Sequence, residues 1–251
     1  MPFTPGHPAI ILPLIRWQYF SATGLIVGSM SPDFEYFFRM SVLGIHGHTN
    51  AGLFYFDVPV TVIVALVFHL VVKKNFINNL PAFLQARFQD TLRFDFVAYL
   101  KKHWIIFLLS AVIGAGSHIF WDSFTHDGRF FVRLFSDIYD NTYFSFQGAN
   151  YPLFYVLQQI STFVGLSVVG LNVLLKKPMH APEISAPRVG YWLLVFAVSI
   201  VILRLRFYIS PSDYNLGNVV VSSITGLMAG VTLCGFINFR NAPHYQKSLN
   251  G

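Results

Sequence analysis

Five long apolar stretches constrain the fold of this chain more than any other feature of its sequence. They cover residues 51–72, 104–124, 152–175, 189–207 and 217–239. Each is about 20 residues long, which is the length of α-helix that crosses a bilayer core of about 30 Å. The sequence therefore predicts five full membrane spans.

The charge content supports a membrane protein and argues against other classes. Only 11% of the 251 residues are charged, whereas a soluble domain has about a quarter. So few charges cannot cover the surface of a soluble protein of this length. The net charge of +6 forms no basic stripe, so nucleic acid is not an expected partner. We predict an all-α, polytopic membrane helix bundle, a single domain over residues 1–251, with the lipid bilayer as its partner.

The distribution of the cations predicts the orientation in the membrane. Eleven of the 17 Lys and Arg residues lie in the connections 73–103 and 176–188 and in the tail after residue 239. By the positive-inside rule this side is cytoplasmic. Within 73–103, apolar residues recur every three or four positions between basic ones, which predicts a cytoplasmic amphipathic segment on the inner membrane surface. A regulatory or partner-binding role is the alternative for this segment.

Residues 8–30 form a sixth apolar stretch that is interrupted near its middle. Pro13 and the run Arg16-Trp17-Gln18 break its pattern. If the chain turns back there, each arm is about ten residues or roughly 15 Å of helix, and His7 and Asp33 emerge together on the outer side. If the stretch crosses the membrane instead, His7 lies on the cytoplasmic side. We favour a re-entrant helical hairpin, because turning backbone is tolerated at membrane depth where protein or a water-filled cavity covers it.

Three short polar segments emerge at the predicted outer face. They cover residues 31–35, 46–50 and 116–128. His118 and Asp122 are four residues apart, so on a helix they share one face and suit two ligands of one metal ion. Taken singly, Asp33 could cap the next helix, and His46 and His48 could be merely solvated. The convergence of three segments favours a metal site, with zinc as the first candidate and manganese or iron if oxygen ligands dominate.

Four motifs together carry a resemblance to a known family. They are Met1-Pro2-Phe3-Thr4-Pro5-Gly6-His7-Pro8, Gly28-Ser29-Met30-Ser31-Pro32-Asp33-Phe34-Glu35-Tyr36, His48-Thr49, and Ser117-His118 followed by Asp122-Ser123-Phe124-Thr125-His126. In this combination the chain resembles domain-of-unknown-function family 4184, a family of uncharacterised bacterial membrane proteins, over most of its length. The same skeleton is similar to the LexA-regulated membrane-bound metal-dependent hydrolases and, more distantly, to zinc-dependent phospholipase C.

The resemblance also implies a set of metal ligands. They are His7, Asp33, His48, His118 and Asp122. His46 is a further candidate, because the hydrolase pattern has a histidine five residues before the one at His48 and this chain does not. The final His-x-x-x-Glu helix of the phospholipases is not found either, which argues against a three-zinc site.

These expectations combine into a predicted function. The chain is expected to be a multi-pass protein of the bacterial inner (cytoplasmic) membrane that uses a divalent metal to hydrolyse a phosphoester, with a phospholipid as one candidate substrate. Glu35, His126 or Asp127 is expected to act as general base or to orient the ligands. The alternatives are a transporter, a metal-binding scaffold and a purely structural membrane component. A transporter needs polar residues running to the inner face, whereas here they gather at one end.

Overall fold

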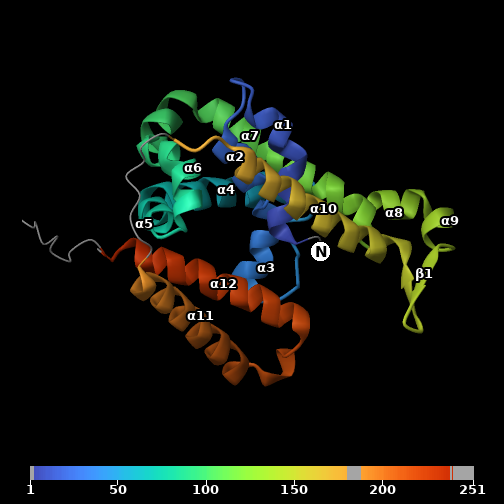
Figure 1. Ribbon diagram of the computed structural model, residues 1–251. Helices are drawn as coiled ribbons and strands as arrows, with labels where there is room; N and C mark the ends of the chain where they lie inside the picture. The colour runs from blue at the N-terminus through green and yellow to red at the C-terminus, as the bar shows by residue number, and fades with distance from the viewer. Residues whose placement is uncertain (1–2, 180–187, 238, 240–251) are drawn as a thin grey trace, which may run out of the picture. The chain divides into compact units, whose positions relative to one another are not determined.

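The computed structural model describes residues 3–179, 188–237 and 239, which are mostly helical (Figure 1). Five of the described helices are long and apolar enough to cross a membrane. They are Leu53–Asn78, Phe96–Leu134, Leu153–Leu175, Val189–Ile209 and Leu216–Gly235. The prediction of five membrane-length helices is therefore confirmed.

The chain divides into two compact units, and one boundary between them falls inside the first long helix. Unit 1 contains Met1–Leu66 and Asp95–Lys177, and unit 2 contains Val67–Phe94 and Pro178–Gly251. Every residue that the sequence nominates for a site belongs to unit 1.

Unit 1 begins with a hairpin of two short helical arms. The first arm is the 3-10 helix η1 (Thr4–Ile11) followed by α1 (Leu12–Ile15), and the second is α2 (Ala22–Gly28), which packs against both. The chain leaves the helix over residues 16–21, where the sequence predicts a break. Ser21 then caps α2, because its Oγ accepts a hydrogen bond from the N–H of Gly24.

Helix α2 lies directly against the long helix α7 (Phe96–Thr125). The two backbones approach closely because small residues form the contact. A Cβ atom on Gly28 would lie 2.6 Å from the carbonyl oxygen of Ala111, and one on Gly114 would lie 2.5 Å from that of Leu25. Small residues at such crossings are typical of packed membrane helices.

The segment 73–103, predicted to be one amphipathic element, is divided among three helices. Its first residues form α5 (Lys73–Asn78), the end of the first long helix. Helix α6 (Ala82–Arg93) follows Pro81, and residues 96–103 are the first turns of α7. α7 starts earlier than the predicted residue 104 because Asp95 caps it, its Oδ1 accepting a hydrogen bond from the N–H of Ala98. The backbone of α7 departs from helical angles only at His103.

The remaining elements of unit 1 carry or flank the polar segments. They are the 3-10 helix η2 (Ser31–Asp33), α3 (Phe34–Arg39), the π-helical turn η3 (Leu53–Asp57), α4 (Val58–Val67), α8 (Phe130–Leu134), α9 (Ser136–Tyr139), β1 (Tyr143–Phe146), β2 (Ala149–Pro152) and α10 (Leu153–Leu175). The antiparallel hairpin β1–β2 is a small departure from the all-α prediction. Its turn has positive φ at Gln147 and Gly148, as a two-residue type I′ turn requires.

Unit 2 consists mainly of packed apolar helices. Its elements are η4 (Phe68–Val72), α5, α6, α11 (Val189–Ile209), the 3-10 helix η5 (Pro211–Asp213) and α12 (Leu216–Gly235). α11 and α12 also meet through small residues, since a Cβ on Gly230 would lie 2.7 Å from the carbonyl oxygen of Val195. Tyr191, Val195 and Cys234 form the buried core of this unit.

Candidate metal centre

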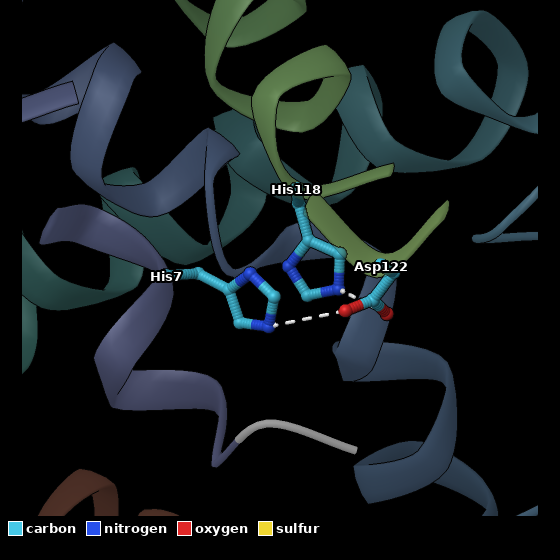
Figure 2. Close-up of side chains that lie close together, drawn as sticks. All are labelled: His7, His118 and Asp122. Carbon is cyan, nitrogen blue, oxygen red and sulfur yellow. Dashed lines mark ion pairs between the residues drawn. The ribbon is translucent and has the colours of Figure 1, made fainter. Parts of the chain in front are cut away.

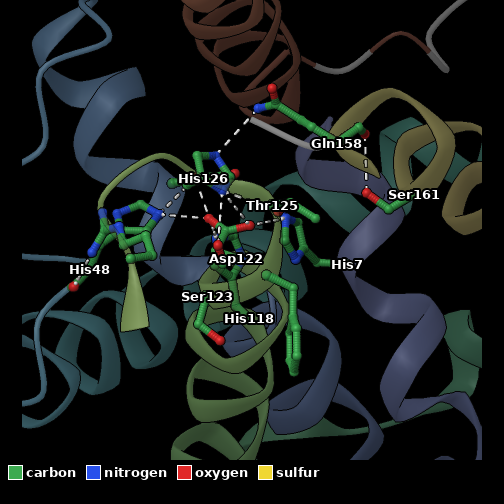
Figure 3. Close-up of polar contacts among 12 residues, drawn as sticks. His7, His48, His118, Asp122, Ser123, Thr125, His126, Gln158 and Ser161 are labelled. Carbon is green, nitrogen blue, oxygen red and sulfur yellow. Dashed lines mark hydrogen bonds and ion pairs between the residues drawn. The ribbon is translucent and has the colours of Figure 1, made fainter. Parts of the chain in front are cut away.

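Four side chains from three segments bring their donor atoms together inside unit 1. The Nε2 atom of His48 lies 3.3 Å from Asp33 Oδ1 and 3.5 Å from Asp122 Oδ2. The Nε2 atom of His118 lies 3.5 Å and 3.4 Å from the same two oxygens. η2 supplies Asp33, the loop after α3 supplies His48, and α7 supplies His118 and Asp122. Figure 3 shows His48, His118 and Asp122. All four residues are buried.

The distances between the nitrogens and the oxygens suit ligands of one metal ion. Ligand atoms placed about 2.1 Å from a zinc ion at the corners of a tetrahedron lie roughly 3.4 Å apart. The four distances between the nitrogens and the oxygens are 3.3–3.5 Å. In addition, Asp33 Oδ1 and the Nε2 atoms of both histidines contact one another and Asp122 as ion pairs and make no other polar contact that the described residues supply. Because buried polar atoms are normally paired, these donors fit a bound cation.

Neighbouring groups fix which atom of each ligand is available. Thr4 Oγ1 donates a 2.6 Å hydrogen bond to Asp33 Oδ2, which leaves Oδ1 directed to the cluster. His118 Nδ1 lies 2.8 Å from the carbonyl oxygen of Ser29. A carbonyl only accepts, so Nδ1 carries a proton, and Nε2 is the nitrogen directed to the two carboxylates. Such supporting contacts are typical of metal-binding histidines and carboxylates.

The loop that carries His48 is held by Glu35. The carboxylate of Glu35 accepts hydrogen bonds of 2.7–2.9 Å from the backbone N–H groups of residues 45–47 and one of 3.0 Å from Arg39 Nε. Burial by itself raises the pKa of Glu35, but these donors hold it below its usual value, so the group is ionised at neutral pH. Arg129 adds a hydrogen bond to the carbonyl oxygen of His48. Glu35, nominated as a general base, is thus engaged in positioning the loop.

We expect the substitution Glu35→Gln to weaken metal binding although Glu35 touches no ligand atom. An amide presents only one acceptor oxygen, so the backbone turn before His48 loosens. Loss of such supporting contacts typically costs about 10- to 100-fold in metal affinity. Competition with a chromophoric chelator measures this, and Asp140→Asn, the same change at an exposed carboxylate, is the control. Equal affinities for both variants and the unmodified chain would contradict the role given to Glu35.

His7 is the fifth member of the cluster (Figure 2). Its ring stacks on that of His118, with centroids 3.6 Å apart and planes inclined by 17°. Its Nε2 lies 3.6 Å from Asp122 Oδ1, and neither of its nitrogens has a hydrogen-bond partner among the described residues. Burial and the nearby His118 lower the pKa of His7 to about 3, so the ring is neutral, the form that binds metals.

His126 lies at the edge of the cluster (Figure 3). Its Nδ1 lies 3.2 Å from the carbonyl oxygen of Asp122 and 3.5 Å from Oδ1 of the same residue. Its Nε2 lies 3.4 Å from Nε2 of Gln158. The side chain of His126 is 20% exposed, against at most 5% for His7, His48 and His118, the other three histidines beside Asp33 and Asp122.

The structure does not bring the other two nominated residues into the cluster. The Nδ1 atom of His46 lies 2.7 Å from the hydroxyl of Tyr55, so this ring is engaged outside the centre. Asp127 is exposed. Of the two histidines in the loop, only His48 reaches the donor atoms, while Glu35 holds the backbone N–H groups of His46 and Gly47.

Asp57 is a buried carboxylate that the sequence reasoning missed. It is fully buried, and neither of its oxygens has a hydrogen-bond partner among the described residues. It ends η3, which packs against both η2 and α7, and it interacts electrostatically with His48 and His118. A sequence signal was present: Asp57 is an acidic residue inside the apolar stretch 51–72, and intramembrane charges are rare and usually functional.

Comparison with known proteins gives a family and no relative of known activity. No curated protein and no solved structure matches the chain significantly. A family model does match, that of the domain of unknown function DUF4184, and it covers residues 1–236, which include the whole cluster. The chain therefore belongs to the DUF4184 family.

Proposed function

We propose that this protein is a metal-dependent hydrolase of the bacterial cytoplasmic membrane and that it acts on a phosphoester, such as that of a phospholipid. The observation that carries the proposal is the set of four buried donor atoms, in which each histidine nitrogen lies 3.3–3.5 Å from both carboxylate oxygens. Asp33, His48, His118 and Asp122 would hold the ion, with zinc as the first candidate. A divalent cation held in this way lowers the pKa of water and polarises a phosphoryl oxygen.

His126 is the group best placed to move a proton in this reaction. Because its Nδ1 donates to the carbonyl oxygen of Asp122, its Nε2 carries a lone pair. In this structure that lone pair accepts a 3.4 Å hydrogen bond from Gln158 Nε2, which a water molecule would replace, in the most exposed part of the cluster. We assign to His126 Nε2 the task of accepting a proton from the attacking water and returning it to the leaving oxygen.

The N-terminal hairpin fits a re-entrant element that delivers ligands to the outer side. Its two ends meet at the cluster, where Thr4 hydrogen-bonds to Asp33. A full membrane crossing by residues 8–30 would separate these ends by the thickness of the bilayer. The excess of cations in the opposite connections supports an outward-facing centre, which a lipid of the outer leaflet could reach.

A metal-binding scaffold is the second candidate function. Four protein ligands fill a tetrahedral shell, and closed shells of this kind are typical of structural zinc sites, whereas catalytic sites keep a position for water. The burial of Asp33 and His118, both 0% exposed, favours the same alternative. The two functions differ in one measurable respect, which is turnover.

Metal-dependent turnover by the purified full chain tests the proposal. We expect the zinc- or manganese-loaded protein to hydrolyse a chromogenic phosphodiester or to release phosphorylated headgroup from phosphatidylglycerol vesicles, and a chelator to stop it. The double variant His118→Ala/Asp122→Ala should lose both metal and activity, while His103→Ala, near the other end of α7, should keep them. If the unmodified protein binds less than one equivalent of metal and the double variant binds the same amount, the proposed metal site is wrong. Bound metal without turnover on either substrate would contradict the hydrolase and support the metal-binding scaffold.

A further inference from the structure

We infer that the centre binds two divalent cations rather than one, with His7 and the second oxygen of Asp122 holding the second cation. This inference rests on the proposed metal site and concerns its composition. The donor atoms of His7, His118 and Asp122 lie within 4.8 Å of one another, which is close enough for a single ion on distance alone. The orientation of the two rings decides against one shared ion.

The stacked rings of His7 and His118 cannot bind the same ion. The lone pair of an imidazole nitrogen lies in the plane of its ring, so a bound metal must lie near that plane, about 2.1 Å from the nitrogen. The two rings are stacked with centroids 3.6 Å apart and planes inclined by only 17° (Figure 2). Planes this nearly parallel do not meet within bonding distance of both nitrogens. By contrast, the rings of His48 and His118 are inclined by 66°, so their lone pairs can converge.

Asp122 has the geometry of a bridge between two such ions. Its Oδ2 lies 3.4–3.5 Å from the Nε2 atoms of His48 and His118, and its Oδ1 lies 3.6 Å from Nε2 of His7. Oδ1 is buried and has no hydrogen-bond partner among the described residues. Paired metal ions in hydrolytic enzymes are about 3.5–4 Å apart, a separation close to that of the two stacked rings.

The buried charge supports a second cation independently. Three carboxylates are buried in or beside the centre, those of Asp33, Asp57 and Asp122, and each is at most 2% exposed. One divalent cation balances the charges of Asp33 and Asp122 and leaves the Asp57 carboxyl group to be satisfied by a proton or by a second cation. Buried charges are normally paired or bound to metal, yet both oxygens of Asp57 have no hydrogen-bond partner among the described residues. A second divalent cation beside the centre would satisfy this carboxyl group.

The two positions would differ in affinity and in role. The first has four protein ligands, whereas the second has His7 and Asp122 and takes water or a phosphoryl oxygen for the rest. Catalytic metal sites need such exchangeable positions and closed structural sites do not. Hydrolysis is therefore assigned to the second cation, because the first already has four protein ligands. His126 is next to this second position, since its Nδ1 lies 3.5 Å from Asp122 Oδ1.

Metal stoichiometry in the full-length protein and in His7→Phe tests this composition. Phenylalanine keeps an aromatic ring on His118 and removes both nitrogen donors. We expect two equivalents of Mn²⁺ or Zn²⁺ in the unmodified protein, one tight and one weak, and only the tight one in His7→Phe. Electron paramagnetic resonance of the Mn²⁺ form should show exchange coupling that the variant loses. Asp57→Asn should weaken the second equivalent about 10- to 100-fold, with Asp140→Asn as control.

The outcomes separate this inference from the proposed function. One equivalent in the unmodified protein, with loss of all binding in His7→Phe, would mean a single ion that includes His7 and would overturn the inference alone. Two equivalents retained in His7→Phe would also overturn it. No bound metal in the unmodified protein would remove the proposed metal centre itself, together with the function built on it.

Discussion

Replacing His118 by alanine is expected to remove the tightly bound metal from the centre. His118 Nε2 is 3.4–3.5 Å from both carboxylates, so it is the ligand that links the donors from η2 to those from α7. A four-ligand zinc site contributes about 10–16 kcal/mol, so one ligand in four is worth roughly 3 kcal/mol, or about 100-fold in affinity. The alanine also removes the ring on which His7 stacks. The observed loss should therefore be at least that large.

Chelator competition and elemental analysis measure this loss, and circular dichroism shows whether the helices persist. His103→Ala is the matched control, because it removes a histidine from the same helix without touching the cluster. Its affinity should equal that of the unmodified chain. If His118→Ala binds zinc as tightly as His103→Ala does, the four-atom cluster is not the metal site.

The sequence predicts the helices of this fold better than it predicts their ends. An apolar run shows where a membrane helix must exist, because a bilayer requires about 20 such residues. It does not show where the helix begins. α7 starts at Phe96 because Asp95 can cap it, so Lys101 and Lys102 lie within the helix although the sequence places them in a connection.

The sequence predicts those ligands of the candidate site whose spacing along the chain places them on one face of an element. The pairing of His118 with Asp122 follows from helical spacing alone. The choice between His46 and His48 does not, because it depends on the hydrogen bonds that Glu35 makes to the loop. Asp57 was not predictable in this way because it stands in an apolar run with no second charged residue near it in sequence, and only the packing of η3 brings it to the centre.

Gly114→Ala and Gly116→Ala form a pair that tests how far the site depends on the crossing of α2 and α7. Both substitutions replace glycine by the best helix former, which alone stabilises a helix interior by about 1 kcal/mol. At Gly116 the nearest neighbour of a new Cβ is the side chain of Leu53 at 3.8 Å, an ordinary contact. At Gly114 the same atom would lie 2.5 Å from the carbonyl oxygen of Leu25 and 2.7 Å from the N–H nitrogen of Ser29.

Gly116→Ala should therefore leave the stability unchanged or raise it slightly, whereas Gly114→Ala should lower the free energy of unfolding by about 1–3 kcal/mol, the usual cost of overpacking. The larger consequence concerns the site. Backbone, unlike a side chain, cannot rotate away, so α2 must shift from α7 and carry Ser29 with it. The carbonyl of Ser29 accepts the hydrogen bond that fixes His118, so metal affinity should fall together with stability only in Gly114→Ala. Thermal unfolding in detergent and chelator competition on both variants measure the two effects, and a Gly114→Ala protein with unchanged metal affinity would show that the centre does not depend on this crossing.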